Sequence, residues 1–283
     1  MQTAAVTKEL KGTELVDMDA LADAGAVGFT DDGIPIMDEH VLTMAMKKAA
    51  ELDLPISLHE EDPEFIIKSG VNQGKVAEQL GYGGASSTAE DVMVARDCVL
   101  ALHTGASVCI QHISSGNSVE LVRTAKKLGA DVHAEATPHH FTLTEEAVNG
   151  DDANFKINPP LRRADDVKAI KEALASGVID AIATDHAPHH PTEKARSFDE
   201  APFGVVGLET AIPVTITELV RTGILTPLQM VEKMSYNPAK IIGIDRGVLA
   251  PGKVADIAVV DPTAEYDIDS NRFASKGKNT PFE

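Results

Sequence analysis

Residues 182–190 read Ile-Ala-Thr-Asp-His-Ala-Pro-His-His, and this stretch decides how the rest of the chain is interpreted. The mostly apolar run at 178–183 stops abruptly before Asp185, and four histidine or acidic residues then fall within six positions. A strand that delivers a carboxylate at its C-terminal end, followed by a loop, is typical of catalytic groups in α/β barrels. Asp185 is therefore a candidate metal ligand, a candidate general base, or both. The alternative is a surface loop that is simply rich in histidine.

Three other predicted strands are followed by the same kinds of side chain. These strands lie near residues 26–31, 55–59 and 107–112, and the ligand-type residues at their ends are Asp31, Asp32, His59 and His112. Histidine and aspartate suit zinc and similar divalent ions. Taken singly, Asp-Asp-Gly is also a common turn sequence and a lone histidine is more often structural. Because so many corresponding positions carry ligands, the sequence predicts a metal site where the carboxyl ends of the strands meet.

Apolar strands alternate with helical patterns along most of the chain. Six strands are expected, near residues 2–6, 26–31, 55–59, 107–112, 131–136 and 179–185, and helices are expected near 12–22, 38–53, 89–103, 118–128 and 164–175. This alternation implies an α/β fold with parallel strands. In the helix at 89–103 the apolar pattern puts Val92, Ala95, Val99 and Leu102 on the inner face.

Two further stretches bear on the organisation of the chain. In the loop at 154–162, Pro159 biases Asn158 towards an extended conformation, and the Asn158 amide either faces a ligand or forms a turn. Residues 247–261 read as a turn followed by a strand of about six residues. The sequence therefore predicts a barrel part over residues 1–240, which carries the metal site, and part of a small β domain over 241–283.

Composition limits the classes of partner. The chain has 283 residues, a formal charge of -19 and a pI near 4.8, which argues against nucleic acid and anionic membranes as partners. Two cysteines cannot form a disulfide framework, and Cys109 lies in an apolar run typical of a buried thiol in a reducing compartment. No basic and apolar leader and no apolar run of about 18 residues occurs, so a cytoplasmic location is expected.

The motifs together resemble one family, the dihydroorotases of the amidohydrolase superfamily, in the class with a bridging aspartate. The motifs that carry the resemblance are Phe-Thr-Asp-Asp-Gly at 29–33, Leu-His-Glu-Glu-Asp at 58–62, His-Ile-Ser at 112–114, Phe-Lys-Ile-Asn-Pro-Pro-Leu-Arg at 155–162, Ala-Thr-Asp-His-Ala-Pro-His at 183–189, and the segments at 201–210 and 279–282. The resemblance implies a TIM-type (β/α)8 hydrolase barrel with two zinc ions per site. It also implies the zinc-dependent, reversible cyclisation of N-carbamoyl-L-aspartate to dihydroorotate in pyrimidine biosynthesis.

The resemblance also implies a role for each matching residue. Asp32 matches the carboxylate that bridges the two zinc ions, with Asp31 as the rival choice, and His59 and His112 match ligands of the second zinc. Asp185 matches a ligand of the first zinc that also acts as general acid and base. The positions that match substrate contacts are Asn158, His189, Phe203 and Gly204. Related hydantoinases carry a carbamylated lysine where Asp32 falls, and no lysine ends this strand, which favours dihydroorotase.

One part of the family pattern has no counterpart among the 283 residues. Family members hold the first zinc with a His-x-His pair, followed by an arginine for the substrate carboxylate, and no such spacing occurs here. We therefore expect an incomplete barrel without its first strands, impaired activity, and one zinc or none. The family implies a homodimer. The alternatives are an inactive structural partner of aspartate transcarbamoylase, or another cyclic amidohydrolase.

Overall fold

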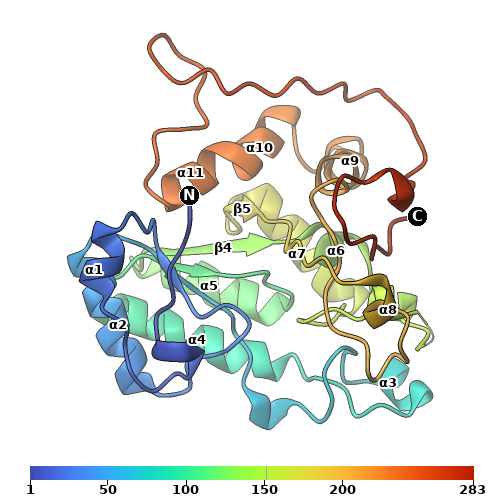
Figure 1. Ribbon diagram of the computed structural model, residues 1–283, viewed down its shortest axis with the longest axis horizontal. Coiled ribbons are helices and arrows are strands. Elements are labelled where there is room, and N and C mark those ends of the chain that lie inside the picture. Colours follow the sequence, from blue (N-terminus) through green and yellow to red (C-terminus); the bar gives the residue numbers. More distant parts are fainter. Residues whose placement is uncertain (151) are drawn as a thin grey trace.

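The computed structural model describes residues 1–150 and 152–283, and a parallel sheet lies at its centre (Figure 1). The strands are β1 (Phe29–Thr30), β2 (Ile56–Leu58), β3 (Val108–Ile110), β4 (Val132–Ala136) and β5 (Ala181–Ile182). Their order in the sheet follows the sequence, and every neighbouring pair is parallel. The predicted α/β class is confirmed, and the carboxyl ends of the strands lie at one edge of the sheet.

Helices connect the strands and pack side by side in the same order, α2 against α4, α4 against α5, and α5 against α7. The longer helices are α2 (Glu39–Glu51), α4 (Thr88–Thr104), α5 (Gly116–Lys127) and α7 (Ala164–Ser176), and the shorter ones are α1 (Met18–Asp23), α3 (Lys75–Leu80), α6 (Pro138–Thr142), α8 (Pro191–Lys194), α9 (Ala211–Thr215), α10 (Pro227–Val231) and α11 (Asn237–Ile241). The bounds predicted for the four longer helices agree with the structure to within two residues.

Local sequence explains where these helices begin and end. The Asp38 carboxylate accepts the N–H groups of His40 and Val41 and so begins α2. Gly105 ends α4 with a φ of 72°, a left-handed conformation that favours glycine. The helix predicted over 12–22 forms only from Met18, because the Asp17 side chain caps it there.

The sheet does not close into a barrel within the described residues, which confirms the expected incomplete barrel. At one edge β5 pairs with β4 alone, and at the other β1 pairs with β2 and, through one bridge, with Ala4. Ala4 donates to the Gly28 carbonyl at 3.0 Å and accepts from Thr30 at 2.8 Å. The strand predicted at 2–6 therefore lies beside β1, but it pairs through a single bridge.

The predicted inner face of α4 is wrong. Val92, Val99 and Leu102 are exposed, by 37%, 63% and 39%. The buried stripe instead contains Ala89, Glu90, Met93, Val94, Asp97, Cys98 and Ala101. Two of those residues are acidic: Glu90 pairs with Arg162 and Asp97 pairs with Arg96. Because the buried face carries these acidic residues, the apolar pattern selected the opposite face of the helix.

The main core lies between the sheet and these helices, with Phe29, Ile56, Ile110 and Ile170 fully buried. A second cluster under the loops includes Val71, Ile157, Leu161, Phe198 and Val205. Burying one such side chain stabilises the fold by about 1.5–3 kcal/mol. The second cluster matters for the site because it supports the segments that follow β4 and β5. Cys98 and Cys109 are free and buried, as predicted for Cys109.

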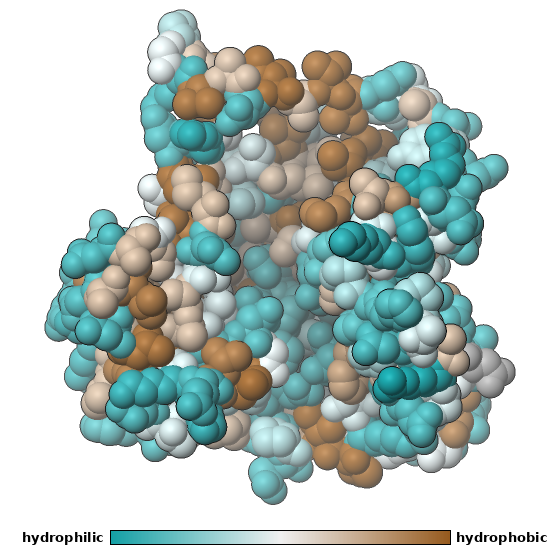
Figure 2. Space-filling model, in the orientation of Figure 1, coloured by the Kyte–Doolittle hydropathy of each residue, from teal (hydrophilic) through white to brown (hydrophobic). Residues whose placement is uncertain are grey.

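After α11 the chain loops outward and runs over α10 and α9 to its end (Figure 1). The strand predicted within 247–261 is not formed, and Val259 in that stretch is 94% exposed. Hydrophobic side chains gather on this side of the molecule, over α9 and α10 (Figure 2), where Leu228 is 77% exposed. The division at residue 240 stays a prediction. Among the described residues, no helix has the length and apolar character needed to cross a membrane.

Candidate metal and substrate site

Three predicted ligands meet where β1, β2 and β3 end. Asp32, His59 and His112 each offer one ligand atom, and these atoms all lie within 4.8 Å of one another. His59 and His112 are buried and Asp32 is exposed. Their convergence follows from the parallel sheet, because each residue comes directly after, or two residues after, the end of its strand.

The ring nitrogens of His59 and His112 are arranged in a way that suits a shared metal ion. Nδ1 of His59 lies 2.9 Å from Nε2 of His112, and Nδ1 of His112 is buried without a hydrogen-bond partner. Burial, together with the charges of His59 and His140, holds the pKa of His112 well below its usual value. The neutral imidazole is the form that binds metals. Two imidazoles and one carboxylate are a donor set suited to zinc or a similar divalent ion.

The structure separates Asp31 from Asp32. Asp31 is 3% exposed, and its Oδ1 accepts the backbone N–H groups of Val6 at 2.8 Å and Thr7 at 3.1 Å. Its Oδ2 accepts the Thr7 hydroxyl. Asp31 therefore ties the first residues of the chain to the end of β1, and Asp32 is the carboxylate that joins the histidine cluster.

Asp185 lies beside this cluster. Its φ of 47° falls in the left-handed region, which is costly for a residue other than glycine and is frequent at functional sites. Burial, and then the Asp32 carboxylate, raise the pKa of Asp185 to about 6, while His59 acts in the opposite direction. Its carboxylate is not one of the ligand atoms that lie within 4.8 Å of one another. A carboxyl group with this pKa can hold or release a proton near neutral pH.

Asn158 is joined to the cluster through a carboxylate that the sequence patterns did not single out. Its Nδ2 donates to Oε2 of Glu61 at 2.8 Å, and Nε2 of His59 lies 3.2 Å from the same oxygen. Burial acts to raise the pKa of Glu61, but the hydrogen bonds with His59 and Asn158 bring it below its usual value. Oδ1 of Asn158 is buried and has no hydrogen-bond partner among the residues that the structure describes, so it is available to a ligand.

The other predicted substrate residues form a separate unit after β5. Nε2 of His189 donates to the Phe203 carbonyl at 2.6 Å. The Asn279 side chain donates to the Gly204 carbonyl at 3.0 Å and accepts from the His189 N–H at 3.1 Å. Gly204 has a φ of 104°, and a Cβ there would lie 2.6 Å from the Ala187 Cβ. His189, Phe203 and Gly204 thus lie together, and their contact with substrate stays a prediction.

Lys156 supports this unit from inside the protein, and the sequence patterns did not single it out. Its Nζ donates to the carbonyls of Asp199 at 2.9 Å and Ala201 at 2.7 Å, and lies 4.8 Å from the centre of the Phe203 ring. Its own carbonyl accepts the Gly204 N–H at 3.0 Å. Burial lowers the pKa of Lys156.

Comparison with known proteins identifies the family. The amidohydrolase family profile matches residues 2–281. The chain belongs to the amidohydrolase family. It is 56% identical over 283 residues to a dihydroorotase of Clostridioides difficile and 52% identical over 282 residues to a dihydroorotase of Clostridium acetobutylicum. It covers 67% and 66% of those proteins, and so spans about two thirds of the length of these curated relatives.

Solved structures agree on the fold of this amidohydrolase. The L-hydantoinase of Arthrobacter aurescens matches the whole chain with a TM-score of 0.86 and 26% identity, and the chain covers 66% of it. The D-hydantoinase of a Thermus species matches with a TM-score of 0.83 and 23% identity, and the chain covers 64% of it. The sequence resemblance to this superfamily is therefore confirmed, together with the α/β fold.

Two more groups in the amidohydrolase site were given no role by the sequence patterns. Glu135 on β4 is half-buried. Its partial burial, followed by the Asp185 and Asp32 charges, raises its pKa to about 7. The strand alternation of residues 131–136 was the available signal, since it puts His133 and Glu135 on the same face. His140 after β4 donates from Nε2 to the Pro159 carbonyl at 2.9 Å and so supports the Asn158 loop.

Proposed function

We propose that this chain carries the metal-binding and proton-transfer part of a dihydroorotase site, which cyclises N-carbamoyl-L-aspartate to dihydroorotate and reverses that reaction. The observation that carries the proposal is the convergence of Asp32, His59 and His112, with Asp185 beside them, at the carboxyl ends of parallel strands. Relatives at 52–56% identity that are named dihydroorotase support the substrate class.

Zinc is the metal that we assign to this site, held by Asp32, His59 and His112. Bound there, zinc would polarise the amide carbonyl of the substrate and favour attack on it at neutral pH. The protein's own part is to supply the neutral imidazole of His112 and to keep the ligand atoms of Asp32, His59 and His112 close together before metal binds. The same proposal covers Asp185 as a further ligand and the binding of a second zinc ion.

Asp185 moves the proton in this scheme. In ring closure the carbamoyl nitrogen attacks the carbon of the side-chain carboxyl group, which enters the step carrying one proton from solution, a C–N bond forms and water leaves. The Asp185 carboxylate takes the proton that the nitrogen loses and returns it to the departing oxygen. In ring opening Asp185 takes a proton from the attacking water and delivers it to the ring nitrogen as the C–N bond breaks. A pKa of about 6 suits both directions.

The remaining assigned residues orient the substrate. Oδ1 of Asn158 is free to accept an N–H of the ring. The Phe203 carbonyl accepts one hydrogen bond from His189 and keeps a second lone pair for an N–H of the ring amide. The hydrogen bond from the Gly204 N–H to the Lys156 carbonyl fixes the backbone beside it. Holding reactants in one geometry can supply several kcal/mol of the barrier. A homodimer remains the expected assembly, and a role beside aspartate transcarbamoylase remains the alternative for an inactive chain.

A second candidate function is the hydrolysis of hydantoins or dihydropyrimidines. It is favoured by the TM-score of 0.86 with the Arthrobacter aurescens L-hydantoinase. Against it, β1 is followed by Asp31 and Asp32, with no lysine to be carbamylated at that point.

The test compares the two substrates on zinc-loaded protein. One sample is the 283-residue chain, and another is a chimera in which the Clostridioides difficile relative supplies the residues outside its match to this chain. We expect weak or no cyclisation of carbamoyl-aspartate by the chain alone and zinc-dependent cyclisation by the chimera, lost in Asp185→Ala. Hydantoin hydrolysis without cyclisation would reject the dihydroorotase assignment, and an Asp185→Ala chimera with full activity would reject the role of Asp185.

A further inference from the structure

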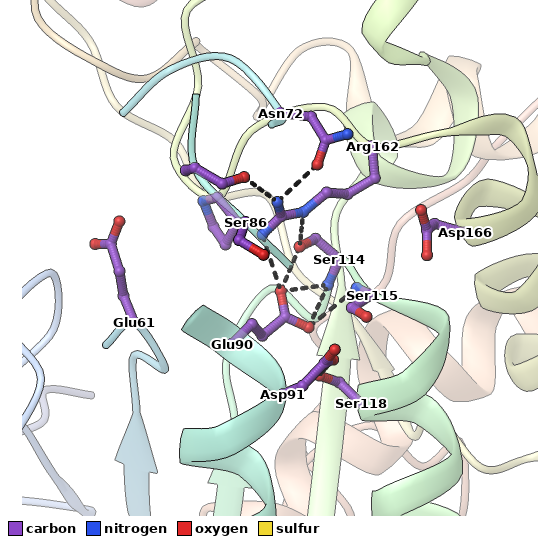
Figure 3. Close-up of polar contacts among 12 residues, drawn as sticks. Glu61, Asn72, Ser86, Glu90, Asp91, Ser114, Ser115, Ser118, Arg162 and Asp166 are labelled. Carbon is purple, nitrogen blue, oxygen red and sulfur yellow. Dashed lines mark hydrogen bonds and ion pairs between the residues drawn. The ribbon is translucent and has the colours of Figure 1, made fainter. Parts of the chain in front are cut away.

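A buried ion pair lies between the histidine cluster and the Asn158 loop. Arg162 is 4% exposed and Glu90 is 3% exposed. In Figure 3 the two side chains face each other, with Glu90 on α4 and Arg162 on the segment that leads to α7. Nη2 of Arg162 lies 4.0 Å from Oε2 of Glu90.

The guanidinium group of Arg162 joins three segments of the chain. Its Nε donates to the Ser114 hydroxyl at 3.1 Å. Its Nη1 donates to Oδ1 of Asn72 and to the Ala85 carbonyl, both at 2.9 Å. These bonds use the planar, forked arrangement of arginine donors, which the single ammonium group of lysine cannot reproduce. Arg162 therefore holds the loop after β3 against Asn72 and Ala85, which lie before and after α3.

Glu90 holds the backbone directly after His112. Its carboxylate accepts the Ser114 N–H at 3.1 Å and the Ser115 N–H at 3.0 Å, and also the Ser114 hydroxyl. Burial raises the pKa of Glu90, and the Arg162 charge and the hydrogen bonds from Ser114 and Ser115 act against that rise. The ion pair thus keeps the Glu90 carboxylate inside the protein as the acceptor for the N–H groups of Ser114 and Ser115. Ser114 lies two residues after the predicted metal ligand His112.

His112 needs such support because its backbone is strained. Its φ is 31°, a conformation that is sparsely populated for residues other than glycine. Conformations of this kind persist only where the surrounding structure fixes them on both sides. Before His112, Gln111 donates to the Leu58 carbonyl at 3.0 Å. After it, the Ile113 N–H donates to the Glu135 carbonyl at 2.9 Å, and the Ser114 N–H donates to the Glu90 carboxylate.

The same arginine is fixed within the substrate segment. It lies four positions after Asn158, and its own carbonyl accepts the Glu145 N–H at 2.8 Å. The Asn72 amide bridges this second attachment, since it accepts from Arg162 and donates to Oε2 of Glu145 at 2.5 Å. Both the main chain and the side chain of Arg162 are therefore held.

We propose that Arg162 and Glu90 are positioning residues that set His112 and Asn158 relative to each other. Neither residue touches the metal or the reacting atoms, and both act through the Ser114–Ser115 backbone and the 158–162 segment. The part that concerns metal binding rests on the donor cluster alone. The part that concerns substrate rests on the proposed dihydroorotase function.

The test measures the zinc dissociation constant of the full chain by competition with a chromophoric chelator. Arg162→Lys keeps the charge and loses the fork, and Ser114→Ala removes the hydroxyl that both Arg162 and Glu90 use. Loss of a group that orients a metal ligand weakens metal binding by about 10–100-fold, and we expect that change for Arg162→Lys and a smaller one for Ser114→Ala. Arg163→Lys is the matched control, because the Arg163 side chain is 67% exposed and pairs only with Asp166 at 3.7 Å among the contacts described. We expect no change in its zinc dissociation constant.

Circular dichroism first establishes which variants are folded. A folded Arg162→Lys with the zinc dissociation constant of the parent chain overturns the proposal, and if that variant does not fold, Ser114→Ala decides in the same way. Dihydroorotate binding is measured in parallel on the zinc-loaded chimera with the Clostridioides difficile relative, and we expect it to weaken in Arg162→Lys. Absence of dihydroorotate binding in the chimera without this substitution, together with the zinc effect, would refute the proposed function and leave the positioning of His112 supported. Unchanged dihydroorotate binding in a folded Arg162→Lys would refute the link to Asn158.

Discussion

Replacing Asp31 should lower the stability of the chain, and replacing Asp32 should weaken zinc binding, although the two residues are neighbours of the same type. Asp31 accepts hydrogen bonds from Val6 N–H, Thr7 N–H and the Thr7 hydroxyl, and Val6 and Thr7 are both fully buried. Hydrogen bonds to a charged acceptor contribute about 1.5–3 kcal/mol each. Three at the lower value amount to about 4.5 kcal/mol, and the lower value applies because the first residues of the chain can move into water. Asp31→Ala should therefore lower the free energy of unfolding by about 4 kcal/mol.

Asp32 is exposed and belongs to the ligand cluster. Exposed substitutions usually change stability by less than about 0.5 kcal/mol, so metal-free Asp32→Ala should unfold like the parent chain. It should instead weaken zinc binding by more than the roughly 10–100-fold that is typical of groups one step further from a metal. Asp31→Asn is the matched control, because it retains the volume and one acceptor oxygen, and its destabilisation should lie between those of the parent and Asp31→Ala.

Urea unfolding in the presence of a chelator measures the first quantity, and chelator competition measures the second. The reasoning fails if Asp31→Ala unfolds within about 1 kcal/mol of the parent, a difference that ordinary substitutions produce. If Asp31→Ala is stable and cannot bind zinc, Asp31 is the metal ligand and the roles assigned to the two carboxylates must be exchanged.

Three further predictions concern the parts that support the site. Lys156→Met should destabilise the chain by about 2–4 kcal/mol, because the carbonyls of Asp199 and Ala201 lose a charged donor. Hydrogen exchange at the Gly204 N–H should become faster, and exchange at the parent rate would contradict this prediction. Gly204→Ala should weaken substrate binding, because φ is 104° and the new Cβ would lie 2.6 Å from the Ala187 Cβ; unchanged binding in calorimetry would show that the loop adapts. Burial acts to raise the pKa of Asp180, but the interactions of its carboxylate with His133 and Lys126 lower that pKa overall. The contribution of Asp180 to stability is therefore present above its unfolded pKa of about 3.9. This contribution is lost as pH falls through the lower folded pKa. Urea unfolding as a function of pH should therefore show that the advantage of the parent over Asp180→Asn shrinks on acidification, and a constant difference would exclude this linkage.

The strands and their ligand-bearing ends could be predicted from the sequence because each signal is local. An apolar run of about five residues that stops at a histidine or aspartate is visible without knowledge of the rest of the chain. Parallel pairing then follows from the helices between the strands. For this reason the convergence of His59 and His112 with one of the two aspartates after β1 could be expected from the order of the residues alone.

The main features that could not be predicted depend on polar contacts across long sequence separations. Glu90 occupies the buried stripe of α4 because Arg162 pairs with it. Asp97 lies in the same stripe and pairs with its sequence neighbour Arg96. No local pattern reveals a pairing between residues 90 and 162, so hydropathy alone placed the inner face of this helix on the wrong side. The choice between Asp31 and Asp32 was open for the same reason, since it depends on contacts that Asp31 makes with Val6 and Thr7.

The most direct test of the account is a crystal of the 283-residue chain soaked in zinc and measured for anomalous scattering. The account predicts a zinc peak within bonding distance of Asp32, His59 and His112, about 2.0–2.2 Å from their ligand atoms, with Asp185 next to it. A peak bound to Asp31, or zinc bound only at sites away from this cluster, would contradict the assignment of the metal site on which the proposed function depends.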